Sequence, residues 1–293
     1  MKSKNKGGVA IIVLCSILIV LGLVVLIVSP IIGAVAVLGG IGGIIYGVKA
    51  RKRRKIELQE IKDKEAATEA EKQRAAERRA QKIADFAATL EAIPRVDIEK
   101  SEIPAKRKQG KPYPKLTNIT ARTDIQKLFP LVVVDVETTG LKPAGNDIIE
   151  VAAIRYNTPF VPESCFTTFC KPRNPIPAAA SEVNHITDDM AEDAPTFQEI
   201  AASLSEYIKG CNVVGHNVEF DADFLFACGA DLPETKYYDT LQLSRYVDKE
   251  LPDHKLETVL RAYGILRNDA HRAISDAYAT GLLFEKLVQE KRS

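Results

Sequence analysis

The chain has 293 residues, more than a typical single domain requires, and 27% of them are charged, with a net charge of +1. This composition excludes a wholly disordered chain, and five cysteines without a C-x-x-C pair exclude a disulfide scaffold and a cysteine-rich zinc site. The charge is nevertheless uneven, because residues 1–123 carry a net +12 and residues 124–293 a net −11. A strongly basic half indicates contact with nucleic acid or with a membrane surface.

Residues 1–50 are expected to form a membrane anchor. No charged residue occurs from Gly7 to Val48, and this run is long enough for two helices, since about 20 apolar residues cross a bilayer. Pro30 divides the run, because a proline ends or kinks the helix that precedes it. The sequence therefore predicts a hairpin of two transmembrane helices at about 9–28 and 31–48.

The charges that flank this hairpin set its expected topology. Lysines precede the first helix, and six lysines and arginines follow the second within residues 49–55. Because positive flanks stay on the cytoplasmic side, both termini and the domain that follows are predicted to be cytoplasmic. A single span with a re-entrant or cleaved partner is the alternative. The repeat of Gly39, Gly43 and Gly47 would let helix backbones approach closely, and whether it or the following helix dimerises is open.

Two further segments separate the anchor from the rest of the chain. Residues 51–93 are expected to form a charged helical stalk, since they are rich in strong helix formers. Because apolar residues recur at helical spacing only in its last turns, a solvated helix is favoured over a coiled coil. Residues 94–123 are expected to be a basic linker, with four prolines and eight basic against three acidic residues. Its Lys106-Arg107-Lys108 cluster would suit phosphates or anionic headgroups, with a solvated spacer as the alternative.

Residues 124–293 are expected to form the globular domain. The apolar, β-branched run from Leu131 to Val134 is typical of a strand buried on both faces. Because strand side chains alternate, Asp135 and Glu137 share one face at the end of this strand, where open α/β sheets place their ligands. Two neighbouring carboxylates repel each other unless a cation joins them, and hard oxygen ligands favour Mg²⁺ or Mn²⁺.

Further acids follow later elements of the domain. Asp221 comes just after a predicted strand at 212–214, and Asp276 lies in the first turns of a predicted helix, with His271 in the loop before it. Taken singly, the two acids would be ordinary first-turn helix residues and the histidine an exposed loop residue. Additional elements are predicted as strands at 148–156 and 165–170 and as a helix at 196–209.

Three motifs occur in a fixed order along this domain: D-x-E-T-T-G at 135–140, H-N-x-x-F-D at 216–221 and H-x-x-x-x-D at 271–276. Together they resemble the DEDDh 3′→5′ exonucleases, the DnaQ-like family that includes the proofreading exonuclease of bacterial replicative polymerases. The resemblance covers about residues 128–290 and leaves the first 123 residues outside. It implies an α/β, ribonuclease H-like fold with a mixed five-stranded sheet flanked by helices.

The resemblance also implies roles for individual residues. His271 would be the general base, and two divalent cations, Mg²⁺ or Mn²⁺, would be held by Asp135, Glu137, Asp221 and Asp276. Asn184 is a departure, because it stands where relatives often have a histidine that contacts substrate. The residues implied to cradle the terminal nucleotide are Thr138, Leu141, Asn184, His216, Asn217 and Phe220.

These observations predict a membrane-anchored, metal-dependent 3′→5′ exonuclease that hydrolyses phosphodiester bonds at nucleic-acid 3′ ends and releases nucleoside monophosphates. Single-stranded DNA is the favoured substrate. The net charge of −11 over residues 124–293 argues against broad electrostatic contact with a duplex, and this favours a short single-stranded end of either polymer. A nuclease for RNA or short oligoribonucleotides is one alternative. A catalytically silent membrane scaffold for a polymerase or repair partner is another, and the biological process stays open.

Overall fold

The computed structural model describes residues 6–25, 30–110, 112, 115–267 and 269–292 of the chain. The chain divides into two compact units, Met1–Arg78 and Arg79–Ser293.

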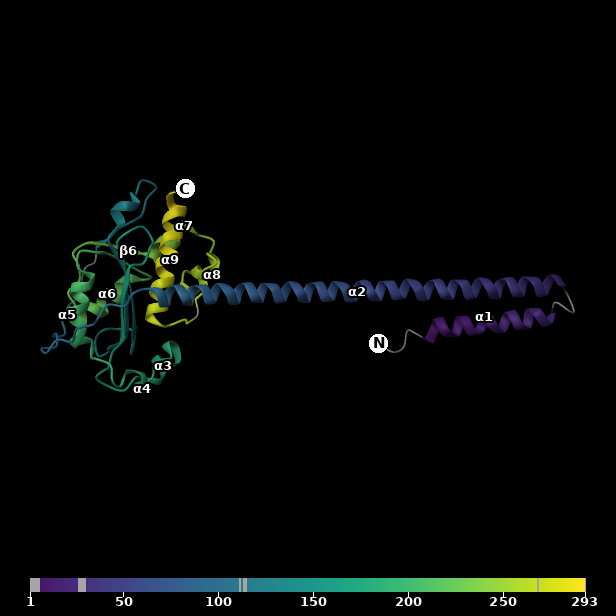
Figure 1. The fold of residues 1–293 in the computed structure, drawn as a ribbon, viewed down its shortest axis with the longest axis horizontal. Coiled ribbons are helices and arrows are strands. Elements are labelled where there is room, and N and C mark those ends of the chain that lie inside the picture. Colours follow the sequence, from purple (N-terminus) through teal and green to yellow (C-terminus); the bar gives the residue numbers. More distant parts are fainter. Residues whose placement is uncertain (1–5, 26–29, 111, 113–114, 268, 293) are drawn as a thin grey trace. The chain divides into compact units, whose positions relative to one another are not determined.

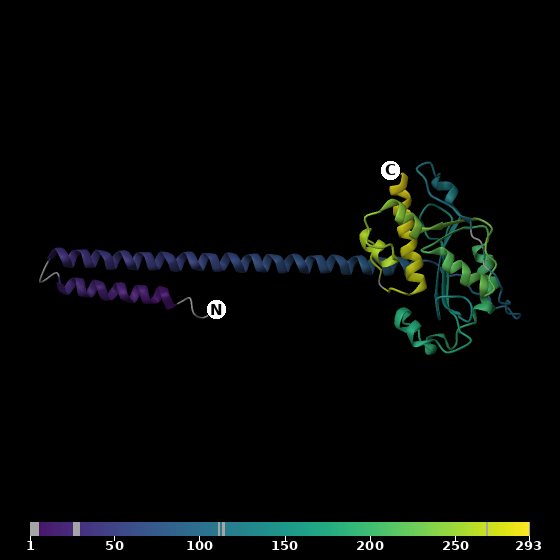
Figure 2. The same ribbon diagram turned by 180° about the vertical axis from the view of Figure 1, so that it is seen from behind.

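The first unit contains helix α1 (Lys6–Val25) and the greater part of helix α2 (Pro30–Ala92). The two helices run side by side (Figure 1; Figure 2). Their contact uses the glycines of α2, because a Cβ at Gly40, Gly43 or Gly47 would meet Ile19, Cys15 or Ile12 of α1, respectively. A Cβ at Gly39, the first glycine of the predicted repeat, would meet no atom of α1 within 4 Å. The glycines that approach α1 are therefore Gly40, Gly43 and Gly47 instead of the predicted repeat of Gly39, Gly43 and Gly47.

No helix within the described ranges combines the length and the apolar character needed to cross a membrane. The spans predicted at 9–28 and 31–48 are therefore not identified in this part of the chain. Their predicted break also lies partly outside the described residues, which omit 26–29. Helix α2 begins at Pro30, a residue that suits a first helical turn because an N–H there would have no partner within the helix.

Helix α2 then continues without interruption to Ala92, so the predicted second helix and the predicted stalk form one element. The sequence permits this because residues 51–92 contain strong helix formers and no proline. Its last turns, from Arg79 onward, belong to the second unit. There Phe86 is 6% exposed and its ring lies 4.9 Å from that of Tyr278. The apolar end of the predicted stalk is thus part of a folded core.

The second unit is built on a mixed sheet of six strands in the order β1-β6-β5-β2-β3-β4. β3 is antiparallel to both of its neighbours, whereas the other pairs are parallel. The strand beyond the five that the resemblance implied is β1, which is two residues long and lies in the predicted linker, outside the region of about residues 128–290 that carries the resemblance. The strands are β1 (Lys115–Leu116), β2 (Leu131–Thr138), β3 (Ile148–Tyr156), β4 (Ser164–Phe169), β5 (Asn212–Gly215) and β6 (Lys236–Asp239).

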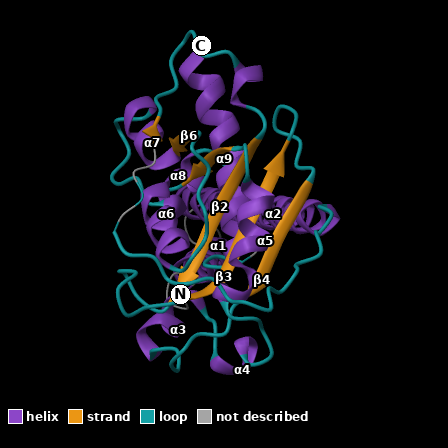
Figure 3. Cartoon of the chain, turned by 90° about the vertical axis from the view of Figure 1, so that its left-hand side faces the viewer, coloured by secondary structure: helices purple, strands orange, loops and turns teal. Residues whose placement is uncertain are grey.

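Helices cover both faces of this sheet (Figure 3). The alternation along β2 assigns the faces, because Val132 and Val134 pack in one apolar cluster while Leu131 and Val133 pack in another. Helices α5 and α6 cover the first face, and α7 and α9 the second. The remaining bounds are η1 (Ile125–Leu128), α3 (Ala178–Asn184), α4 (Asp188–Ala191), α5 (Phe197–Ile208), α6 (Val218–Ala227), α7 (Thr240–Val247), α8 (Leu256–Ala262) and α9 (Ala273–Arg292).

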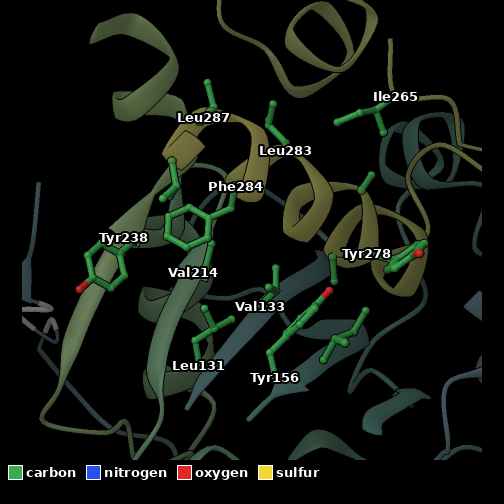
Figure 4. Packing of buried hydrophobic residues seen from close by; sticks show 14 of the residues in the cluster. Leu131, Val133, Tyr156, Val214, Tyr238, Ile265, Tyr278, Leu283, Phe284 and Leu287 are labelled. Carbon is green, nitrogen blue, oxygen red and sulfur yellow. The ribbon is translucent and has the colours of Figure 1, made fainter. Parts of the chain in front are cut away.

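The core between the sheet and α9 is closely packed (Figure 4). The ring of Phe284 in α9 packs at a tilt against that of Tyr238 in β6, with ring centroids 5.6 Å apart. Gly281 lies where a Cβ would collide with the hydroxyl of Tyr156, so a small residue is required at this point of the helix. This close approach fixes the start of α9 relative to β2 and β3, which is where the acidic motifs lie.

The first part of the segment expected as a linker is instead packed within the second unit, against β4, α5 and α6. We call residues 94–110 the strap. Cys165 of β4 donates its N–H to the carbonyl of Pro94 at 2.8 Å, and Ala105 donates to the carbonyl of Gln198 in α5 at 2.8 Å. Lys108 donates to the carbonyl of Ala227, the last residue of α6, at 3.1 Å. The composition of the strap gives no hint of this docking, because irregular backbone that finds its partners far along the chain leaves no periodic pattern.

Candidate active site

Four carboxylates meet at the end of β2. Asp135 and Glu137 come from β2 itself, Asp221 from the first turn of α6 and Asp276 from the first turn of α9. The Oδ1 atom of Asp221 accepts a hydrogen bond from the backbone N–H of Val136 at 3.0 Å, which places this carboxylate between the two acids of β2. The structure thus brings together all four acids that the sequence singled out.

The pKa values of the carboxyl groups in this cluster are raised, because burial and mutual repulsion disfavour their negative charges. Burial, reinforced by the neighbouring carboxylates, raises the pKa of Asp135 well above its usual range. Burial and the nearby Asp276 raise the pKa of Glu137 to about 8. Burial also raises the pKa of Asp221 to about 8, although the hydrogen bond from Val136 opposes the shift. Ionised side chains in such a site require bound cations.

The donor set fits hard divalent cations. Ligand atoms of Glu137, Asp276 and His271 lie within 4.8 Å of one another, and Asp135 and Asp221 add further carboxylate oxygens. Oxygen-rich sites of this kind select Mg²⁺ or Mn²⁺ over softer metals. Arg267, which the sequence did not single out, ion-pairs with Asp276 and with Glu257 in this part of the structure.

His271 lies at the exposed edge of the cluster, in the loop just before α9. Its backbone has a φ of 58°, which turns the chain sharply into the helix. Glu150 of β3 fixes this turn, because its buried carboxylate accepts from Arg272 Nη2 at 3.1 Å and from Ala273 N at 3.0 Å. Arg272 in turn lies over the ring of Phe169, 4.8 Å from its centroid. Sequence reasoning missed these supporting residues, although Glu150 pairs directly with Glu137 across the two strands.

The residues expected to hold the terminal nucleotide differ in how the structure uses them. Leu141 is 86% exposed, directly after the first motif. The Thr138 hydroxyl donates to the carbonyl of Gly140 at 2.8 Å. Asn184 is buried at the end of α3, and its side chain accepts from Ile186 N at 3.1 Å while its amide approaches the carbonyl of Thr138 at 3.5 Å. Asn184 therefore holds α3 near the end of β2 (Figure 3).

His216 has both ring nitrogens engaged inside the protein. Nε2 donates to the carbonyl of His254 at 2.9 Å, and Nδ1 lies 2.9 Å from the hydroxyl of Thr240. Burial lowers the pKa of His216 to about 4, so the ring is neutral at physiological pH. This histidine joins the end of β5 to α7 and to the loop before α8 through its two ring nitrogens.

The other two residues of the second motif lie at the start of α6. Asn217 has a φ of 68°, and its N–H donates to Asp239 Oδ1 at 2.9 Å. Its side chain is exposed. Phe220 is partly buried, with its ring 5.0 Å from that of Phe224. The left-handed Asn217 thus starts the helix in the orientation that points Asp221 at β2.

The sequence pattern of the exonuclease family matches residues 132–284, more than half of the chain. The chain belongs to this exonuclease family. The matched region contains all four acids of the cluster and His271. The matched region is therefore an exonuclease domain of the hydrolase class, and the family's cofactors are two divalent metal ions, Mg²⁺ or Mn²⁺, which the acidic cluster suits.

Curated relatives of this exonuclease include two DNA polymerases III of the PolC type. The one from Caldanaerobacter subterraneus subsp. tengcongensis is 31% identical over 175 residues, 59% of this chain and 12% of the relative. The one from Latilactobacillus sakei subsp. sakei is 37% identical over 173 residues, 58% of this chain and 12% of the relative. The chain therefore spans only a small part of the length of these relatives.

Solved structures with a similar chain trace include two exonucleases. Exonuclease X in complex with 5′-overhanging duplex DNA aligns with a TM-score of 0.45 and 21% identity, over 54% of this chain and 91% of that chain. Exonuclease I of E. coli in complex with a dT13 oligonucleotide aligns with a TM-score of 0.46 and 24% identity, over 53% of this chain and 40% of that chain.

Proposed function

We propose that the protein is a membrane-anchored 3′→5′ exonuclease that removes nucleoside monophosphates from the 3′ ends of DNA, with single strands preferred. The observation that carries this proposal is the meeting of four carboxylates, from three separate elements, beside an exposed histidine. Such a cluster is costly to the fold unless it binds cations, so its presence is best explained by chemistry that needs them.

The proposed mechanism assigns one task to each group. Divalent cations bound by Asp135, Glu137, Asp221 and Asp276 would polarise the scissile phosphate and stabilise the negative charge that develops on the leaving oxygen. His271, which lies at the exposed edge of the cluster, accepts the proton of the attacking water. The water oxygen bonds to phosphorus, the bond to the 3′ oxygen of the preceding nucleotide breaks, and that oxygen takes up a proton. The product is a nucleoside 5′-monophosphate.

The choice of DNA is supported by the relatives, which are named as DNA polymerases. The preference for single strands is supported by charge, because residues 124–293 carry a net −11 and an extended duplex footprint requires many lysines and arginines. A short strand end that is held mainly through bound metal cations needs fewer lysines and arginines.

The substrate preference is tested with the purified full-length chain on single strands of identical sequence in DNA and in RNA. Each strand carries the label at its 5′ end, in the presence of Mg²⁺, Mn²⁺ or EDTA. We expect a metal-dependent ladder that shortens from the 3′ end and advances faster on DNA. Faster shortening of RNA, above all of oligomers only a few nucleotides long, would replace DNA by oligoribonucleotides as the substrate.

Anchoring through residues 1–50 is supported by the sequence and by the side chains of the first unit. The run from Gly7 to Val48 has no charged residue, and basic residues flank it on both sides. In the described part of this run, Leu14 is 64% exposed and Leu38 is 68% exposed, an arrangement suited to lipid rather than to water. We propose that both termini and the exonuclease domain lie in the cytoplasm.

Anchoring is tested by fractionation of cells that produce the full chain or a chain without residues 1–50. We expect the full chain to stay with membranes after alkaline carbonate extraction and the shortened chain to be released. In sealed vesicles with the cytoplasmic side outward, added protease should reach tags at both ends. Release of the full chain by carbonate, or protection of one tag only, would contradict the hairpin.

A further inference from the structure

Arg107 of the strap reaches into the loop that joins β2 to β3. Its Nη2 donates to the carbonyls of Pro143 at 2.6 Å and Asn146 at 3.0 Å. Its Nη1 donates to Asp147 Oδ1 at 2.9 Å and to the sulfur of Cys228 at 3.3 Å. Three of the four acceptors belong to one short loop, so this guanidinium fixes the loop at several points at once.

Asp147 carries this restraint to the first motif. Its buried carboxylate also accepts from Arg173 N at 3.1 Å and from Arg173 Nε at 2.8 Å. Its backbone pairs with Thr139, because Thr139 N donates to the carbonyl of Asp147 at 3.0 Å and Asp147 N donates to the Thr139 hydroxyl at 3.0 Å. A displacement of Asp147 would therefore move Thr139 and the exposed Leu141 that follows.

The strap itself is held firmly on either side of Arg107. Ala105 and Lys108 donate backbone hydrogen bonds to α5 and α6, as described above. The ammonium of Lys108 donates to the carbonyl of Ala230 at 2.9 Å. Gly229 accommodates the strap, since a Cβ at this position would lie 2.9 Å from that of Ala105. Arg107 is thus presented to the loop by a backbone with little freedom to move.

We propose that Arg107 is a positioning residue of the exonuclease site and that the strap is a working part of this enzyme. The strap precedes residues 132–284, the part of the chain that matches the family. Through Asp147, Arg107 holds the loop that carries Thr139 and Leu141 in the geometry that receives the 3′-terminal nucleotide. Asp135 and Glu137 do not depend on this contact, because both are paired with β3 in the sheet. This inference rests on the proposed function.

The experiment compares Arg107→Gln with Lys106→Gln in the full-length chain. Both changes remove one positive charge from adjacent residues, but the Lys106 side chain is exposed. At a temperature well below unfolding, we expect Arg107→Gln to lower kcat/KM on a single-stranded 3′ end by about 10-fold or more, since small misplacements at a site are costly. Arg107→Lys should recover only part of this loss, because an ammonium cannot span the same acceptors. Lys106→Gln should match the wild type, and Mn²⁺ affinity should stay within about twofold in all variants.

Amide hydrogen exchange supplies a second measurement that does not depend on activity. We expect the peptide that contains Thr139 and Asp147 to exchange faster in Arg107→Gln than in Lys106→Gln. An unchanged kcat/KM in Arg107→Gln, or unchanged exchange in this loop, would overturn the inference. A wild-type chain without nuclease activity would overturn the proposed function instead, and exchange alone would then decide whether Arg107 holds the loop.

Discussion

Asp221 and Glu137 link the stability of this protein to pH and to cations. In the metal-free chain, burial raises the pKa of each to about 8, with neighbouring carboxylates adding to the shift at Glu137. In an unfolded chain such carboxyls titrate near pH 4, at about their model-peptide values. Between these values the folded state binds more protons than the unfolded state, so the free energy of unfolding falls as pH rises.

We therefore expect the metal-free chain to melt at a lower temperature at pH 8 than at pH 6. The Asp221→Asn variant should show a smaller fall than the wild type, by at least about 2 °C, which corresponds to about 1 kcal/mol for a domain of this size. Mg²⁺ or Mn²⁺ should remove most of the difference. Thermal melts of the wild type and the variant at both pH values, in EDTA and in Mg²⁺ or Mn²⁺, measure these differences in melting temperature. Equal pH slopes in the wild type and the variant would contradict the electrostatic description of the site.

His271 is expected to act as a general base and to contribute little to the stability of the fold. Replacement by alanine should lower kcat by about 10² to 10⁴, the usual contribution of a general base. His185→Ala is a matched control, because His185 is also exposed and has the same φ of 58°. Single-turnover rates and Mn²⁺ titrations measure the two effects separately. A loss of Mn²⁺ binding as large as the loss of rate would make His271 a metal ligand instead of a base.

At the scale of elements, the sequence predicts the central sheet well and its surroundings poorly. The strand predicted at 148–156 coincides with β3, and the helix predicted at 196–209 contains α5 (Phe197–Ile208). These elements have strong periodicity or continuous apolar runs. β1 and the strap show neither periodicity nor a continuous apolar run. Their positions are fixed by hydrogen bonds to residues far along the chain. Arg107 bonds to a residue 40 positions away and Arg272 to one 122 positions away, distances at which local patterns carry no information.

The same contrast applies within the site. The four acids and His271 were recoverable, because each stands at the end of a strand or the start of a helix within a recognisable motif. The supporting residues Glu150, Arg272 and Arg107 were not recoverable from the sequence. Nothing in their sequence context distinguishes them from other charged residues, and only the folded structure shows their contacts. His216 shows a further kind of contact that the sequence does not reveal, because the hydrogen bonds of its ring nitrogens go to Thr240 and to the carbonyl of His254, which lie 24 and 38 positions away.

The connection between β3 and α9 provides an element-scale prediction. Glu150→Gln should lower the free energy of unfolding by about 2 kcal/mol, because Arg272 loses its charged partner in a buried position. It should also lower kcat, since the turn that presents His271 loses its anchor. Glu163→Gln, at an exposed position after β3, is the control. Urea unfolding and steady-state rates test this, and a destabilised variant with unchanged kcat would restrict Glu150 to a structural role.

The last turns of α2 provide a second prediction at the scale of elements. Phe86→Ala should destabilise the second unit by about 3 kcal/mol or more, as expected for a large side chain removed from a core. Ile61→Ala on the same helix should cost less than about 0.5 kcal/mol, because Ile61 is exposed. Urea unfolding of the full chain measures both. Equal and small effects would mean that the end of α2 is a solvated stalk, as the sequence alone had favoured.

At the scale of the whole molecule, the exonuclease unit begins well before the part of the chain that matches the family. Residues from Arg79 onward are compact with the sheet, and they include the apolar end of α2, the strap and β1. Helix α2 is therefore one continuous element with residues in both units of the chain. In the proposed function this element ties a membrane anchor directly to the catalytic core.

The central claim is that the acidic cluster performs metal-dependent removal of 3′ nucleotides. Asp221→Asn tests it most directly, because asparagine keeps an oxygen that can accept from Val136 N while it removes a negative charge. Asp193→Asn, at an exposed position, is the control. On a 5′-labelled single strand with Mn²⁺, we predict a 3′-shortening ladder for the wild type and Asp193→Asn, and a loss of at least about 100-fold in rate for Asp221→Asn. Equal rates for all three, or a ladder that persists in EDTA, would contradict the claim.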